Sequence, residues 1–183
     1  IGIRQEALPY MQQLHQQLGE TVNLSVRHDD EVIYVERTSS GTQMMRVVQI
    51  IGARAPLHIT AVGKIFLAAD GPGKCREYAK RTGLPKFTDN THTDQASLLK
   101  EIERVRQQGY AFDNEEAEKG VSCVGAGIYG DDGQLVAGLS ISAPSERFDQ
   151  GWSAQITQAA ERISRALGHA GRRGADLTVP TRC

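Results

Sequence analysis

Apolar residues recur at two different periods near the start of the chain, and the change of period separates a helix from strands. Over residues 4–18 they follow helical spacing, and Gly19 is suited to end that helix. Residues 21–27 and 31–36 instead resemble strands, the first alternating apolar with polar residues as a half-buried strand does. Residues 28–30 between them have the composition of a turn. This pattern predicts an N-terminal helix followed by a β-hairpin.

The middle of the chain carries one more strand and a block of helices. The expected elements are a strand over 43–51 and helices over 60–69, 73–81 and 94–108. Thr60 and Asp94 are good N-caps, and Gly109 is placed to end the third helix. The pattern then returns to strands, over 110–113, 122–129 and 134–142, before a last helix over 150–167.

This order of elements predicts an α+β fold. Tight turns join the strands, so we expect an antiparallel sheet of about six strands, flanked by the helices. The expected organisation is a linker helix over 1–19, one domain over 20–168, and a tail over 169–183. The tail contains Gly, Arg and Pro without periodicity, so we expect it to be poorly ordered.

Small residues gather on one face of the last predicted hairpin. Residues two apart on a strand share a face, which groups Cys123, Gly125 and Gly127 on one strand and Gly138, Ser140 and Ser142 on the other. A turn centred on residues 131–132 places Cys123 opposite Ser140, whereas one centred on 132–133 places it opposite Ser142. In both registers the face could form the floor of a polar pocket. It could equally let a helix pack closely, or turn its serines to water.

Two further segments carry candidate binding chemistry. The helix expected at Thr60 begins with N–H groups that favour an anion, and Gly63 allows a ligand or another backbone to approach closely. The more common alternative is an ordinary capped helix. Lys64 follows a glycine but lacks the pattern of a phosphate-binding loop. Asp113 lies just before the acidic pair Glu115 and Glu116, and acidic clusters usually lie in solvated loops. The alternative is that Asp113 points into the pocket as a hydrogen-bonding partner of the ligand.

Composition narrows the classes of protein. The chain has 183 residues, of which 39% are hydrophobic and 23% charged, as in a globular domain. The formal net charge of -1 gives no basic footprint for DNA. No apolar run reaches the roughly 20 residues that cross a membrane, so no membrane partner is expected. Three widely spaced cysteines do not suggest a disulfide framework, which favours a reducing, cytoplasmic location.

The same residues are the candidates for metal binding and for catalysis. His58, Asp113 and Cys123 have metal-binding side chains, but no close spacing joins them, so we expect neither a metal nor another cofactor. Cys123 could act as a nucleophile only with a base nearby, and His58 is the one histidine close to the candidate segments. We therefore expect no catalytic residues and no enzyme activity.

Three motifs, in this order, resemble the C-terminal effector-binding domain of the IclR family of bacterial transcription regulators. They are GARAPLH at 52–58 with TAVGK at 60–64; GYAFD at 109–113 with EE at 115–116 and GVSC at 120–123; and LSISAP at 139–144. Each motif alone is weak evidence for the family, but the three motifs in this order are specific to it. The resemblance covers residues 5–168. One departure is Ala61, where the family often has glycine.

The resemblance implies a GAF-like fold with a pocket for a small-molecule effector, expected to be a carboxylate metabolite. It also implies assembly as a homodimer or tetramer, and DNA binding only through an N-terminal winged helix-turn-helix that this sequence does not contain. The implied ligand-contacting residues are Met44, Val47, Ala55, Ala61, Val62, Asp113, Cys123, Ser140 and Ser142.

Two alternatives remain at this point. Some GAF-like domains are cysteine-dependent redox enzymes, which need a second, resolving cysteine near the first. Cys75 is expected in a separate helix and Cys183 in the tail. The other alternative is an oligomerisation domain that binds no ligand.

Overall fold

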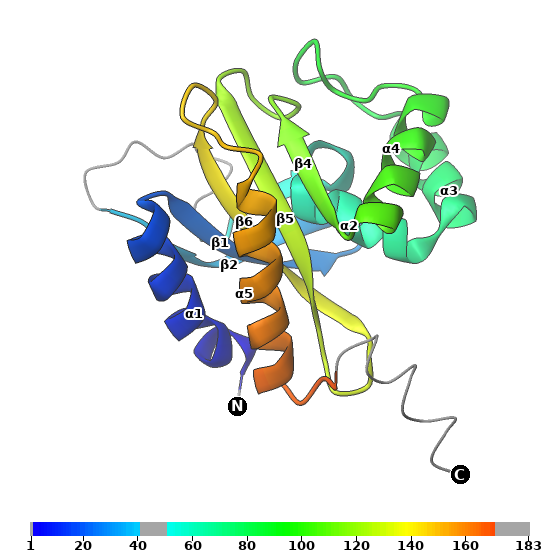
Figure 1. Cartoon of the computed structure of the whole chain (residues 1–183). Helices are drawn as coiled ribbons and strands as arrows, with labels where there is room; N and C mark the ends of the chain where they lie inside the picture. Colours follow the sequence, from blue (N-terminus) through cyan, green and yellow to red (C-terminus); the bar gives the residue numbers. More distant parts are fainter. Residues whose placement is uncertain (1, 41–50, 171–183) are drawn as a thin grey trace.

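A curled antiparallel sheet of six strands forms the centre of the computed structural model, which describes residues 2–40 and 51–170 (Figure 1). The strand order is β3-β2-β1-β6-β5-β4. The strands are β1 (Thr21–His28), β2 (Glu31–Thr38), β3 (Arg54–Pro56), β4 (Tyr110–Asn114), β5 (Val121–Tyr129) and β6 (Leu135–Pro144). The predicted α+β fold with a GAF-like antiparallel sheet is confirmed.

Helices cover both faces of the sheet. On one face, α1 (Ile3–Leu18) packs beside α5 (Trp152–Ala166), with Met11, Leu24 and Ile163 in the shared core. The other face carries α2 (Ala61–Asp70), with α3 (Pro72–Thr82) and α4 (Gln95–Gln108) packed around it. A short 3-10 turn, η2 (Leu57–Ile59), leads into α2. Within the described ranges, no helix has the length and apolar character needed to cross a membrane.

Local signals in the sequence set the helix boundaries. The Thr60 hydroxyl accepts a hydrogen bond from the Gly63 N–H at 2.9 Å, and the Asp94 carboxylate accepts one from Ser97 at 2.8 Å. Each bond satisfies an N–H that the first turn of a helix leaves without a partner. Gly109 ends α4 with a left-handed backbone conformation. The capping predictions are therefore confirmed.

The strand predicted over 43–51 falls almost entirely outside the described residues, and Ile51 lies in a turn. The third strand in the described part of the chain is β3, which the sequence analysis did not predict. It pairs with β2, with Ala55 opposite Val32. Three residues ending in proline give no alternating pattern, so this edge strand carried no usable signal.

The expectation that β1 is half-buried was wrong. Val22 and Leu24 face the core that the strand shares with α1 and α5. Asn23 and Ser25 point to the opposite face, and both are also fully buried. The reason is that a second layer of helices, led by α2, covers that face. The polar residues of this alternating strand therefore lie inside the protein.

Candidate functional site

The β5–β6 hairpin adopts the second of the two registers considered. Cys123 lies opposite Ser142, Gly125 opposite Ser140, and Gly127 opposite Gly138, with an irregularity only next to Tyr129. Small residues of both strands thus meet on one face, as predicted.

A row of polar residues crosses four strands on this face. Strand pairing places Asp113 of β4 next to Cys123 of β5, which is next to Ser142 of β6 and then Thr21 of β1. All four are at most 6% exposed. The Cys123 Sγ and Ser142 Oγ atoms are 3.2 Å apart, within hydrogen-bond distance for sulfur. Polar side chains are therefore aligned in the interior beneath α2.

The next row contributes a residue that the sequence analysis missed. It runs from Ala111 through Gly125 and Ser140 to Asn23. The Asn23 Nδ2 atom donates a hydrogen bond of 3.0 Å to the Ser142 hydroxyl, which joins β1 to the polar row. Alternation in β1 was the available signal, but it suggested that Asn23 faces solvent.

The small residues let a helix pack closely over part of the face, as one of the structural interpretations predicted. A Cβ atom on Gly138 would overlap the side chain of Val62, and one on Gly125 would press against Ala61 and Val62. Gly63 has a comparable role toward η2, because a Cβ there would overlap the backbone of Leu57. Of the two alternatives for Gly63, the structure shows close approach of a backbone.

Asp113 is held in the interior by the loop that follows it. Its side chain is 4% exposed, and its Oδ1 accepts a hydrogen bond of 2.7 Å from the Glu116 N–H. Burial, reinforced by the charge of Glu116, raises the pKa of Asp113 to about 7. The carboxyl group is therefore poised to be neutral or charged around neutral pH.

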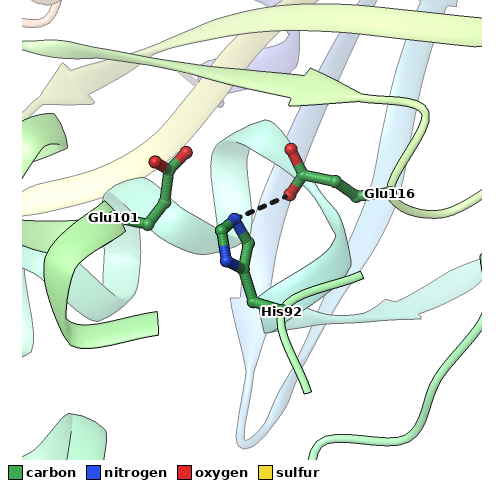
Figure 2. A group of neighbouring side chains, drawn as sticks. All are labelled: His92, Glu101 and Glu116. Atoms are coloured by element: carbon green, nitrogen blue, oxygen red, sulfur yellow. Dashed lines mark ion pairs between the residues drawn. The ribbon is translucent and has the colours of Figure 1, made fainter. Parts of the chain in front are cut away.

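A buried ionic cluster lies behind Asp113, where the sequence had suggested a solvated acidic loop. The Lys64 ammonium donates to Glu101 at 2.7 Å and to Glu116 at 2.8 Å, and its side chain is fully buried. Figure 2 shows His92 beside both carboxylates, with its Nε2 atom 3.7 Å from Glu116. Glu116 belongs to the interior because Lys64 compensates its charge.

This cluster also contains the group of side chains best arranged for a metal within the described residues. The candidate ligand atoms of His92, Glu101 and Glu116 all lie within 4.8 Å of one another. Lys64 already supplies a cation to both carboxylates, and they raise its pKa even though burial alone would lower it. The three residues therefore form, with Lys64, a buried ion network in which one ammonium group bridges two carboxylates.

His58 is separate from Cys123. Its Nδ1 atom lies 3.0 Å from the Tyr78 hydroxyl and its Nε2 atom 2.9 Å from the Pro85 carbonyl oxygen, so both ring nitrogens have partners. Cys75 is buried in α3, and burial raises the pKa of its thiol to about 11. The His58 ring is therefore held by Tyr78 and Pro85, and Cys75 belongs to the apolar cluster around α3.

The remaining predicted contacts divide into two groups. Met44 and Val47 lie outside the described residues. Ala55 is buried in β3, in the same apolar cluster as Val62 and Tyr34. Tyr34 was not foreseen: burial raises its pKa, and the electrostatic influence of Cys123 and Asp113 raises it further. The structure thus brings together Ala61, Val62, Asp113, Cys123, Ser140 and Ser142 at one end of α2.

Comparisons with known proteins relate this chain to bacterial transcription regulators. The family described as "Bacterial transcriptional regulator IclR C-terminal" matches residues 1–169. The HTH-type transcriptional repressor AllR of Escherichia coli K12 is 35% identical over a match of 164 residues, and the match covers 87% of this chain. The match covers 60% of that repressor, so the chain spans about three fifths of the relative's length.

Solved structures show the same fold. IclR of Thermotoga maritima superposes with a TM-score of 0.83 at 35% identity, covering 92% of this chain and 70% of that one. An IclR homolog from Microbacterium hydrocarbonoxydans, complexed with 4-hydroxybenzoate, gives a TM-score of 0.83 at 26% identity, covering 90% and 68%. The chain belongs to the IclR family of bacterial transcriptional regulators and corresponds to their C-terminal domain.

Proposed function

We propose that this chain is the effector-sensing domain of a transcription regulator and that it binds a small organic acid at the polar face beneath α2. The observation that carries the proposal is the buried row of Asp113, Cys123 and Ser142 across three strands, with Ser140 in the neighbouring row. A sheet interior does not usually hold so many polar groups without a purpose, because burying each one costs free energy unless it is hydrogen-bonded. The ligand of the Microbacterium homolog, a small aromatic acid, has the expected chemistry.

The carboxylate of the effector would lie between the first turn of α2 and the serines of β6. The Thr60 hydroxyl already satisfies the Gly63 N–H, so the binding groups would be the remaining N–H groups of that turn and the hydroxyls of Ser140 and Ser142. Ala55 and Val62 would contact the apolar part of the molecule, together with Met44 and Val47.

Asp113 would contact the end of the effector away from the carboxylate. Two nearby carboxylates repel when both are charged, so Asp113 would either be protonated or accept a hydrogen bond from a hydroxyl group. Its raised pKa, to about 7, supports the first arrangement at neutral pH and below.

Binding would act on DNA indirectly. A ligand shifts an equilibrium only by its difference in affinity for two conformations, so the proposal requires a second arrangement of the domain. Helix α1 packs on α5 and on β1 and β2, which makes it the element that would carry such a change toward an N-terminal winged helix-turn-helix. Assembly as a homodimer or tetramer and a cytoplasmic location complete the proposal.

The test is thermal denaturation of this chain against a panel of small keto, hydroxy and aromatic acids. A ligand that binds only the native state raises the midpoint with the logarithm of its concentration. We expect a rise with at least one acid, and Ser140→Ala or Asp113→Ala should weaken its binding about tenfold if one hydrogen bond is lost.

Ser122→Ala is the matched control. Ser122 is also a buried serine of the hairpin, but it precedes Cys123 in β5 and so faces the other side, where its hydroxyl lies 2.8 Å from that of Ser145. Its substitution should leave ligand affinity unchanged. Equal affinity in the Ser140→Ala, Asp113→Ala and wild-type proteins would disprove the site, and no response to any acid would disprove the proposed effector class.

A further inference from the structure

Two buried oxygen atoms on β1 have no hydrogen-bond partner among the described residues. They are Oδ1 of Asn23 and Oγ of Ser25, and both residues are 0% exposed. The amide nitrogen of Asn23 is already used, because it donates to Ser142. A buried polar atom without a partner is costly, and most such atoms in folded proteins are hydrogen-bonded. These two therefore require an explanation.

Their position provides one. Asn23 lies opposite Ser140 and Ser25 opposite Gly138, so both share the face and the rows of the proposed site. Residues two apart on a strand are about 7 Å apart, a span that one small molecule can contact. Asn23 is also joined to the polar row directly, through its bond to Ser142.

We infer that Asn23 and Ser25 are specificity-determining residues, which accept hydrogen bonds from a donor group of the effector. This inference rests on the proposed function and narrows its ligand to acids that carry a hydroxyl or an N–H group. An amide oxygen can only accept, and a serine hydroxyl can both accept and donate. An acid without a donor would leave the Asn23 oxygen buried and unsatisfied in the complex.

Buried acceptor atoms can discriminate strongly between ligands with and without a hydrogen-bond donor. A site that contains buried acceptors rejects an analogue without the matching donor, because the complex then keeps the unsatisfied atom. Val62 and Tyr34 add apolar walls on the same side of the sheet, which would exclude water from these oxygens once a ligand is bound. The donor group thus contributes more here than it would at a solvated surface.

The experiment compares acids that differ only in the donor group, by titration calorimetry with this chain. The pairs are 4-hydroxybenzoate with benzoate, lactate with propionate, and oxamate with pyruvate, the last pair testing an amide N–H. We expect the donor-bearing member of at least one pair to bind about tenfold more tightly, the effect of one hydrogen bond. The pair that shows the preference distinguishes a hydroxyl from an N–H group.

Ser25→Ala and Asn23→Leu should each abolish that preference, measured as the ratio of the two affinities within a pair. Asn23→Leu also removes the hydrogen bond to Ser142, so its affinities are compared only within a pair and not with wild type. Ser25→Ala removes only an oxygen without a described partner, so it should fold normally, and its thermal midpoint verifies this. Thr157→Val is the matched control. Its Oγ1 is likewise buried without a partner, but it belongs to α5, on the opposite face of the sheet, so the preference should persist.

The possible failures are distinguishable. Acids that bind with no preference within any pair, in a protein whose binding is lost in Ser140→Ala, would overturn this inference and leave the proposed function intact. A preference that survives Ser25→Ala and Asn23→Leu would likewise overturn it. No binding by any of the six acids would overturn the proposed class of effector and this inference together.

Discussion

The ammonium group of Lys64 lies 2.8 Å from Oε1 of Glu116, and the same glutamate donates its backbone N–H to Asp113. One residue thus connects a buried ion network in the helical layer to the polar row of the sheet. Helix α2 supplies Lys64 to the ion network, and Ala61 and Val62 to the contact with the sheet. Its position is therefore fixed both by the ion network and by the sheet.

Lys64→Met should lower the free energy of unfolding by about 3–5 kcal/mol, because it leaves two carboxylates buried without their cation. Denaturation by urea measures this loss. The matched control is Lys86→Met: its ion pair with Asp89 is largely exposed, so a change of at most about 1 kcal/mol is expected.

Replacing the whole network tests the cause of that loss. The triple variant Lys64→Met, Glu101→Gln, Glu116→Gln contains no uncompensated charge from these residues and should recover much of the stability lost in Lys64→Met. If the triple variant is less stable than Lys64→Met, charge burial is not the reason for the loss.

Asp113→Asn should change how stability depends on pH. The folded-state pKa of about 7 lies above the unfolded value of about 3.9, so the folded protein holds a proton that the unfolded chain releases. This contribution is present at low pH and is lost as the pH rises from about 4 to about 7. Over that window the variant should gain stability relative to wild type, by at most about 1.4 kcal/mol per pH unit.

The difference is measured by determining the unfolding free energies of wild type and Asp113→Asn at several pH values. The contributions of the other titrating groups, which both proteins share, cancel in this difference. Asparagine retains an oxygen that can accept the Glu116 N–H, so the local fold is preserved. Parallel curves between pH 4 and pH 7 would show that the Asp113 pKa is close to its ordinary value.

Gly63→Ala should destabilise the protein by about 1–3 kcal/mol or more, because the new methyl group would overlap the Leu57 backbone. Gly73→Ala is its counterpart in α3, where a Cβ would have no neighbour within 4 Å. That change should stabilise by about 0.5–1 kcal/mol, since alanine favours a helix. Thermal unfolding of the two variants should therefore shift in opposite directions.

Asp94→Ala should cost about 1 kcal/mol, the usual effect of losing an N-cap. Asp94→Ser should retain most of the stability, since a hydroxyl can also accept from the Ser97 N–H. Chemical denaturation measures both changes. A serine variant as unstable as the alanine variant would indicate that charge, rather than capping, is the stabilising feature of Asp94.

Local signals in the sequence were sufficient for most elements of the fold. Thr60, Asp94 and Gly109 mark helix ends through bonds and backbone conformations that involve only nearby residues. The meeting of small residues on the last hairpin also followed from alternation, because a hairpin fixes which residues face each other. The choice between its two registers did not, since that depends on the geometry of the turn.

The features that could not be predicted from the sequence depend on contacts between distant segments. Whether Asn23 faces water or a second helical layer is decided by α2, far along the chain. Lys64, Glu101 and Glu116 each resemble surface residues in isolation, and only their meeting explains their burial. Short β3 has no pattern of its own and is defined by pairing with β2.

The pairing of β1 with β6 has a consequence for the order of folding. Asn23 and Ser142 are 119 positions apart, so the two halves of the sheet join through one of the longest loop closures available to the chain. Such contacts form slowly, because the chain loses the entropy of closing the loop before the contacts stabilise it. During synthesis the β1 edge of the β1–β2 hairpin would remain unpaired until β6, near the end of the domain, has left the ribosome. The proposed binding residues lie on both sides of this junction, so the complete effector site would exist only after the two halves of the sheet have joined.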